Sequence, residues 1–228
     1  MKFFLALLPL ILACSHNIYT PPSRPMPLTS PQTLGEGETV ARASGSVSSD
    51  LFGPSIAAGT GGVRRGLGNR LELDADLSYA KVMETATAGT SRSIGMLRVG
   101  GKYRPTESAN LALVAGLGGG YSPAAGPYAS TDVGAVLGYD NRYLIPFLSI
   151  GAFGSVPLSP NEVDVTGPED SQQFLDTPEP TLGVTLGAGI KIPVNRLALV
   201  LGMASTQMWD SDSNDGFMAF GCGIETSF

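Results

Sequence analysis

From about Glu38 onward, the chain alternates apolar residues with small or polar ones, with a period of two. The clearest run covers residues 181–192, in which Leu, Val, Ala and Ile at the even positions oppose Thr, Gly and Lys at the odd positions. Shorter runs with the same period cover residues 71–78, 111–118 and 197–204. Successive side chains of a β-strand point to opposite faces, so these runs predict strands that lie between two different environments.

Turn signals separate the runs and set the expected number of strands. Tight connections are predicted at Gly68-Asn69, Asp140-Asn141 and Val194-Asn195, with a longer one at 105–110. Longer polar loops are expected around residue 50 and at 84–90, 122–127, 157–180 and 210–215. About ten strands with strictly alternating short and long connections indicate an all-β, antiparallel, up-and-down transmembrane β-barrel. Eight strands is the alternative if residues 38–66 are not fully part of the wall.

Three features favour an apolar face that points outward into lipid over a soluble barrel with an apolar interior. The face opposite the apolar one is rich in Gly, Ala and Ser, and only 15% of the chain is charged, against roughly 25% in globular proteins. The last strand also ends on an aromatic residue, Phe228. Aromatic residues gather at both ends of the strands, as the two interfaces of a bilayer require: Tyr79, Tyr121, Tyr128, Trp209 and Phe217 near the long loops, and Tyr103, Tyr139, Tyr143 and Phe228 near the turns.

After Gly37 the pattern resembles the small outer-membrane barrels of the OmpA/OmpX type, and the position of Phe228 resembles their C-terminal assembly signal. The resemblance is one of architecture and rests on many weak signals. It implies recognition by the barrel assembly machinery, with Phe228 as the signal. It also places both termini of the barrel in the periplasm.

The N-terminus has the pattern of an exported lipoprotein. Lys2 and the apolar residues 3–12 form a signal peptide that is too short to span a membrane, and Ile11-Leu12-Ala13-Cys14 resembles the bacterial lipobox. That resemblance implies a signal peptide at 1–13, lipidation at Cys14 and, with Ser15 next, an outer-membrane location. Residues 14–37 are rich in proline and lack periodicity, which predicts an extended linker before the barrel at 38–228.

Little in the chain favours catalysis or nucleic-acid binding. The one histidine, His16, falls in the linker and is not expected to be held near a nucleophile on the barrel. No Cys/His cluster suits a metal and no phosphate-binding loop precedes a helix, so no cofactor is expected. The net charge of -6 argues against nucleic acid as a partner.

Charged residues on the inner face are the main candidate site. Glu72, Asp74 and Asp76 alternate on one strand, while Arg98 and Lys102 share one parity on the next, together with Arg92 and Arg104. Either Arg64 or Arg65 adds a further inward charge. Adjacent columns of opposite charge predict pairing of Asp74 and Asp76 with Arg98 and Lys102 in a lumen that is closed rather than open.

The sequence therefore predicts a non-catalytic outer-membrane β-barrel lipoprotein that acts as a membrane anchor or scaffold, or contacts envelope proteins through its loops. The expected partners are outer-membrane lipid, the assembly machinery and proteins that recognise the acidic loops at 157–180 and 210–215. Two alternatives remain: a small-solute channel with a charged lumen, and a lipid-tethered soluble β-barrel that binds an apolar ligand.

Overall fold

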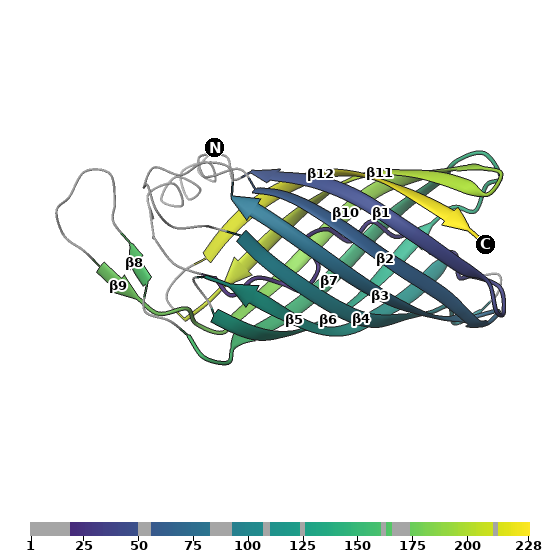
Figure 1. Cartoon of the computed structure of the whole chain (residues 1–228). Coiled ribbons are helices and arrows are strands. Elements are labelled where there is room, and N and C mark those ends of the chain that lie inside the picture. Colours follow the sequence, from purple (N-terminus) through teal and green to yellow (C-terminus); the bar gives the residue numbers. More distant parts are fainter. Residues whose placement is uncertain are drawn as a thin grey trace, which may run out of the picture.

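Ten antiparallel strands close into a single barrel (Figure 1). This computed structural model describes residues 19–49, 56–82, 93–106, 110–123, 126–160, 163–165, 174–211 and 214–228. The wall consists of β1 (Thr39–Ser49), β2 (Ile56–Gly68), β3 (Leu71–Val82), β4 (Ser93–Tyr103), β5 (Leu111–Ser122), β6 (Gly126–Gly138), β7 (Ile145–Pro157), β10 (Thr181–Val194), β11 (Leu197–Trp209) and β12 (Asn214–Ser227). The short strands β8 (Val163–Val165) and β9 (Phe174–Asp176) pair only with each other.

The wall closes because β1 pairs with β12 along almost its whole length, from Val40 opposite Ser227 to Ser49 opposite Met218. Both β1 and β2 belong to the wall, so ten strands is confirmed and the eight-strand alternative is wrong. Among the described residues, no helix is long and apolar enough to cross a membrane.

Most of the large apolar side chains of the strands point outward. Leu117 is 71% exposed, Leu77 67% and Leu182 66%, and similar residues surround the barrel. An apolar surface that is continuous around a protein is unstable in water, whereas lipid solvates it. The expected orientation is therefore confirmed, and this surface suits a transmembrane barrel rather than a soluble one.

The two ends of the barrel differ. At the end named here the turn end, β1 begins and β12 finishes, and the Phe228 amide donates to the Thr39 carbonyl (3.0 Å). The opposite end, the loop end, carries the longest connection, residues 158–180, which contains the β8–β9 hairpin (Figure 1).

Strict alternation of short and long connections is wrong. The connection 104–110 at the turn end is longer than 123–125 at the loop end. The cause lies in β5 and β6, whose pairing continues as far as Ser122 opposite Gly126. Gly126 has a φ of 65°, a left-handed conformation that favours glycine and helps the ladder to start directly after the turn.

The aromatic girdles exist with two exceptions. Seven of the residues assigned to them lie on the outside and are substantially exposed: Tyr79, Tyr103, Tyr121, Tyr139, Tyr143, Trp209 and Phe228. Tyr128 is only 3% exposed because it shares the inward parity of Ser130. Phe217 also has the inward parity, since it pairs with the buried Thr206. The placement of these two residues in the girdles was wrong.

A lysine in the middle of the outer face should destabilise the barrel. Leu117 pairs with Val99 and Thr131 near the middle of β5, and we expect Leu117→Lys to lower the free energy of unfolding by about 2–4 kcal/mol in lipid vesicles. Leu158 is similarly exposed (64%) but follows β7 at the loop end, so Leu158→Lys is the matched control and should have little effect. Urea unfolding of both variants measures the difference, and equal stabilities would show that Leu117 does not face lipid.

Phe228 is 80% exposed at the end of the wall, as an assembly signal needs. We expect Phe228→Lys to lower the amount of folded protein in the outer membrane, measured as the heat-modifiable band on electrophoresis. Tyr143→Lys is the control, because Tyr143 is a similarly exposed aromatic (67%) in a connection at the same end. If both variants accumulate equally, Phe228 has no special role in assembly.

Candidate functional site

The inside of the barrel contains part of the chain itself. Residues 19–38, named here the luminal segment, run through the inside of the barrel from the loop end to the turn end (Figure 1, purple). Tyr19 forms an isolated bridge with Glu179 just before β10, whereas the Thr33 hydroxyl donates to the Asn69 carbonyl in the β2–β3 turn (3.0 Å). The described part of the stretch expected as a linker is extended, but it lies within the lumen.

Side chains of the wall satisfy the backbone of the luminal segment. The Thr20 amide donates to Thr181 Oγ1 (2.9 Å), and Ser155 Oγ donates to the Thr20 carbonyl (2.6 Å). Farther along, the Leu34 amide donates to Glu72 Oε2 (3.1 Å) and Lys102 Nζ donates to the carbonyl of Ser30 (3.1 Å). The prolines at 21, 22, 25, 27 and 31 have no amide hydrogen, which reduces the number of donors that need a partner inside the barrel.

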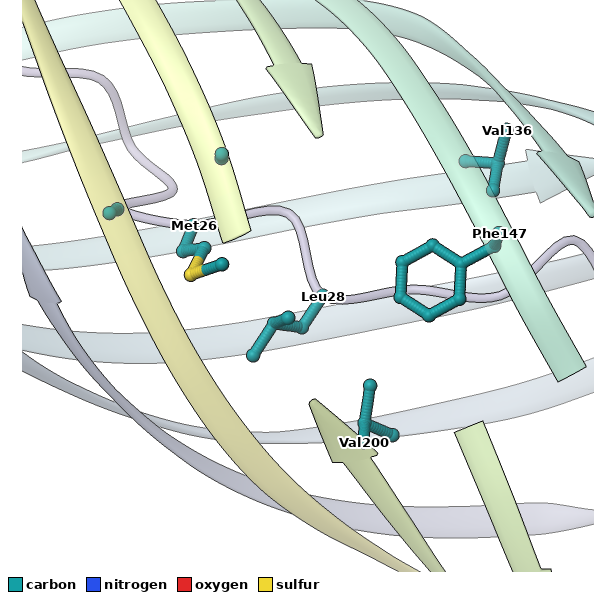
Figure 2. Close-up of a cluster of buried hydrophobic side chains, with 7 residues drawn as sticks. Met26, Leu28, Val136, Phe147 and Val200 are labelled. Carbon is teal, nitrogen blue, oxygen red and sulfur yellow. The ribbon is translucent and has the colours of Figure 1, made fainter. Parts of the chain in front are cut away.

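Apolar contacts fix the middle of the luminal segment. Met26 and Leu28 are 8% and 9% exposed and pack against Val136, Phe147 and Val200 on the inner face (Figure 2). Burying each of these two side chains contributes roughly 1.5–3 kcal/mol relative to leaving it in water.

Glycines of the wall make room for this segment. A Cβ atom at Gly221 would lie 2.7 Å from Met26 Sδ, and one at Gly202 would lie 2.7 Å from Leu28 Cδ2. At Gly118, a Cβ would lie 2.6 Å from the Cβ of Ser23. The small residues of the inner face are therefore needed because a second layer of chain packs directly on them.

Two groups of buried charges lie against the luminal segment. The first, the central cluster, is built on Asp74 and Asp76 of β3. Arg98 Nη1 lies 2.5 Å from Asp74 Oδ2, and Arg42 Nε donates to Asp76 Oδ1 (2.9 Å). Arg24 of the luminal segment lies 3.9 Å from Asp74 and 3.8 Å from Asp76. One pair of acids thus links β1, β3 and β4 to the segment.

The central cluster extends along the inner face, past β5, to β6. Arg98 Nε and Nη2 donate to the two carboxylate oxygens of Asp132 (2.6 and 2.8 Å). The guanidinium group reaches that far because it passes over Gly116, where a Cβ would lie 2.3 Å from Nη2. Bidentate pairs of this kind are among the stronger hydrogen bonds in proteins.

The second group, the turn-side cluster, lies nearer the turn end. Glu72 Oε1 is 2.9 Å from Lys102 Nζ and 3.3 Å from Arg64 Nη1. Glu225 Oε2 is 2.8 Å from both Arg64 Nη2 and Lys191 Nζ. This chain of contacts joins β2, β3, β4, β10 and β12, on opposite sides of the β1–β12 closure.

The structure brings together all five residues selected from the sequence: Glu72, Asp74, Asp76, Arg98 and Lys102 are buried in the lumen. Asp74 pairs with Arg98, but Lys102 pairs with Glu72 instead of an aspartate. Arg64 is the inward arginine and Arg65 is exposed. Arg104 is half-buried next to a turn, and Arg92 lies outside the described residues.

Sequence reasoning missed Arg24, Arg42, Asp132, Lys191 and Glu225. Arg42, Asp132 and Lys191 are each the one charge on their strand, and Glu225 shares β12 only with Asp215, ten residues away, so no column of like charges marked them. The signal that could have found these four residues is the inward parity of a charged residue in a strand whose other residues are mostly small or apolar.

Two small cavities remain beside the luminal segment. One has a volume of about 20 Å³ and is lined by Arg24, Arg42 and Asp76 among others, and the other has about 60 Å³ and lies near Asp132 and Phe153. A single water needs roughly 10–15 Å³ of such volume, so each cavity has room for one or a few waters.

The remaining sequence-predicted sites lie elsewhere. Cys14 and His16 are outside the described residues, as are Glu162, Glu169, Asp170 and Asp212 of the acidic loops. Cys222 is a free cysteine on the outer face. Glu179, at the end of the long connection, accepts a hydrogen bond from Ser211 Oγ.

No family model and no curated protein sequence matches the chain. Similar folds occur among solved structures. The β domain of the Bordetella autotransporter BrkA shares 13% identity over 85% of this chain and 100% of its own, with a TM-score of 0.50. The Neisserial surface protein A shares 13% identity over 84% and 96%, with a TM-score of 0.41. The Escherichia coli outer membrane protease OmpT shares 12% over 87% and 100%, with a TM-score of 0.42. The BrkA similarity shows that the chain has the fold of outer-membrane β-barrels.

Removing the acids of the central cluster should destabilise the barrel. In the double variant Asp74→Ala, Asp76→Ala, the cations Arg24, Arg42 and Arg98 lose shared partners inside the lumen. Leaving buried charges uncompensated costs roughly 3–5 kcal/mol, and less where water enters. We expect a lower melting temperature in vesicles. The control is Glu36→Gln, an exposed acid at the turn end, and equal melting temperatures for the two variants would contradict a role for the pairs in stability.

Proposed function

We propose that the protein is a non-catalytic outer-membrane β-barrel lipoprotein whose lumen is closed by its own N-terminal segment, and that it serves as an anchor or scaffold. The observation that carries the proposal is the path of residues 19–38 through the barrel. A wall that is filled from within is suited to hold other segments at a membrane surface rather than to pass solutes. Partners would be contacted at the loop end, where the longest connection lies.

The charges of the lumen support a closed barrel rather than a channel. Bases and acids alternate in the two clusters, so that each charged group that the wall contributes to them lies beside one of opposite sign. These bases are Arg42, Arg64, Arg98, Lys102 and Lys191, and these acids are Glu72, Asp74, Asp76, Asp132 and Glu225. Groups that bind one another so closely form a plug, and the space left over is the size of a few waters.

Ligand binding within the barrel has less support. Pockets for small ligands have volumes of about 300–1,000 Å³, far above the larger cavity of about 60 Å³. The apolar surface of the strands lies outside, where lipid is the partner it suits.

A non-catalytic role fits the chemistry of the buried acids. For general acid–base catalysis, the carboxyl group of an aspartate or glutamate must be free to exchange a proton with a substrate. Here Asp74, Asp76 and Asp132 each accept hydrogen bonds from arginine. His16, the one histidine of the chain, precedes the part of the chain that the structure describes.

Conductance of single molecules in a planar bilayer tests the closed lumen. We expect the full chain to show no steady conductance, and a variant that lacks residues 20–34 to conduct, because that deletion empties the lumen. Heat-modifiability establishes that the deletion variant folds.

A pair of point variants supplies the matched control. Leu28→Asp places a charge in the apolar contact with Phe147 and Val200 and should cause intermittent conductance, whereas Thr33→Asp, in a half-buried part of the same segment, should not. Steady conductance of the unmodified protein would overturn the proposal, as would a folded deletion variant that stays closed.

A further inference from the structure

The luminal segment has a direction, which determines the side of the membrane that the preceding residues reach. The segment begins at the loop end and enters β1 at the turn end. We propose that the residues before Tyr19, including Cys14 and its acyl chains, lie on the loop side of the outer membrane, so that the lipid inserts into the outer leaflet at the cell surface. This inference rests on the proposed function, which supplies the orientation of the barrel and the lipidation of Cys14.

The start of the segment is held firmly at the loop end. Thr20 is fully buried, and its amide and carbonyl bond to Thr181, the first residue of β10, and to Ser155, near the end of β7. Its hydroxyl also donates to the Glu179 carbonyl (2.8 Å). These three contacts come from the strand ends and the connection on one side of the membrane.

The other end of the segment is held at the turn end. The Gly37 amide donates to the Gly66 carbonyl (3.0 Å), and the Gly66 amide donates to the Glu38 carbonyl (2.9 Å). Between the two ends, Arg24 contacts the central cluster and Met26 and Leu28 contact the wall. The segment therefore crosses the full height of the barrel once, from the loop end to the turn end.

The distance that the chain can span excludes a lipid on the turn side. From Cys14 to Tyr19 the chain extends at most about 18 Å, at about 3.6 Å per residue. A strand such as β3, with 12 residues, is about 40 Å long and rises about 30 Å along the barrel axis when tilted by about 40°. Starting from Tyr19, Cys14 reaches the bilayer interface at the loop end but not the one at the turn end.

The filled lumen adds a constraint on assembly. Cavities with volumes of about 20 and 60 Å³ do not admit an acyl chain. An acylated N-terminus thus has no path through the closed barrel. The segment therefore has to lie inside the curved sheet before β1 pairs with β12 and closes the wall.

The test compares one short epitope at three positions of the full chain, probed with antibody on intact cells. The positions are after Asn17, after Ser159 in the long connection at the loop end, and after Asn141 in an exposed connection at the turn end. We expect the epitopes at 17 and 159 to bind equally well on intact cells, and the epitope at 141 to bind only after the outer membrane is permeabilised.

Metabolic labelling with a fatty-acid analogue, followed by capture of surface-bound antibody, tests the lipid. We expect captured molecules to carry the label, and Cys14→Ser to lose the label while the epitope at 17 stays accessible. Binding at 159 but not at 17 on intact cells would overturn the inference and leave the proposed function intact. Accessible molecules without label would overturn its lipid part. Equal binding at 159 and 141 would instead contradict the orientation on which the proposed function depends.

A disulfide between the segment and the wall gives a readout that needs no insertion. In a Cys222→Ser background, Thr20→Cys with Thr181→Cys replaces two hydroxyls that both donate to the Glu179 carbonyl (2.8 and 3.3 Å), so the two thiols lie close together. We expect oxidation to change the electrophoretic mobility of this variant but not of Glu36→Cys with Thr181→Cys, whose first residue lies at the turn end. Failure of the first pair to form a disulfide in folded protein would contradict the threaded path.

Discussion

The ion pairs of Asp74 and Asp76 with three arginines connect the chain inside the barrel to three strands of its wall. The acids come from β3, and the arginines from the luminal segment, β1 and β4. The backbone hydrogen bonds of the wall join neighbouring strands, whereas Arg24 connects the wall to the chain inside it. Without these acids the lumen would hold a row of like charges in a medium that solvates them poorly. The central cluster therefore contributes both to the stability of the wall and to the position of the segment inside it.

The composition of the inner face follows from the same arrangement. A barrel of eight strands is just wide enough for its own side chains to fill, and ten strands enclose more space. In this protein the additional space is occupied by residues 19–38, and the inner face bears glycine where the segment approaches most closely, as at Gly118, Gly202 and Gly221. The bulky inward residues lie where the segment needs apolar contacts, as at Phe147 and Val200. The wall and the segment are complementary surfaces within one chain.

The outer face and the number of strands could be predicted from the sequence because a period of two is a direct consequence of strand geometry. The ion pairs of the inner face could not, because they depend on side chains that reach past the residue opposite them in the ladder. Asp76 lies directly opposite Arg98 in the register of β3 and β4, yet Arg98 bonds to Asp74 and to Asp132, two strands away. By contrast, Glu72 lies opposite Lys102 and does pair with it.

The path of the N-terminal segment had no signal in its own residues. A proline-rich stretch without periodicity is equally suited to water and to a polar lumen, since in neither does it pair along a sheet. The signal for its path lies in the wall instead. It consists of glycines on the inner face and of the acids Asp74 and Asp76, which contact Arg24 of the segment as well as arginines of the wall. Those positions become informative only once the ten strands are known to close around a space that they do not fill.

At the loop end, the luminal segment is connected to the longest connection of the barrel. The carbonyl of Glu179 accepts from Thr20, its side chain accepts from Ser211, and it forms the bridge with Tyr19. Glu179 closes the long connection that contains the β8–β9 hairpin, so this connection, the β11–β12 connection and the start of the segment share one residue. A partner that binds the hairpin is thereby linked through the Glu179 backbone to the segment that fills the lumen. The proposed scaffold role needs such a coupling, because the long connection is fastened to the segment that the wall holds in place.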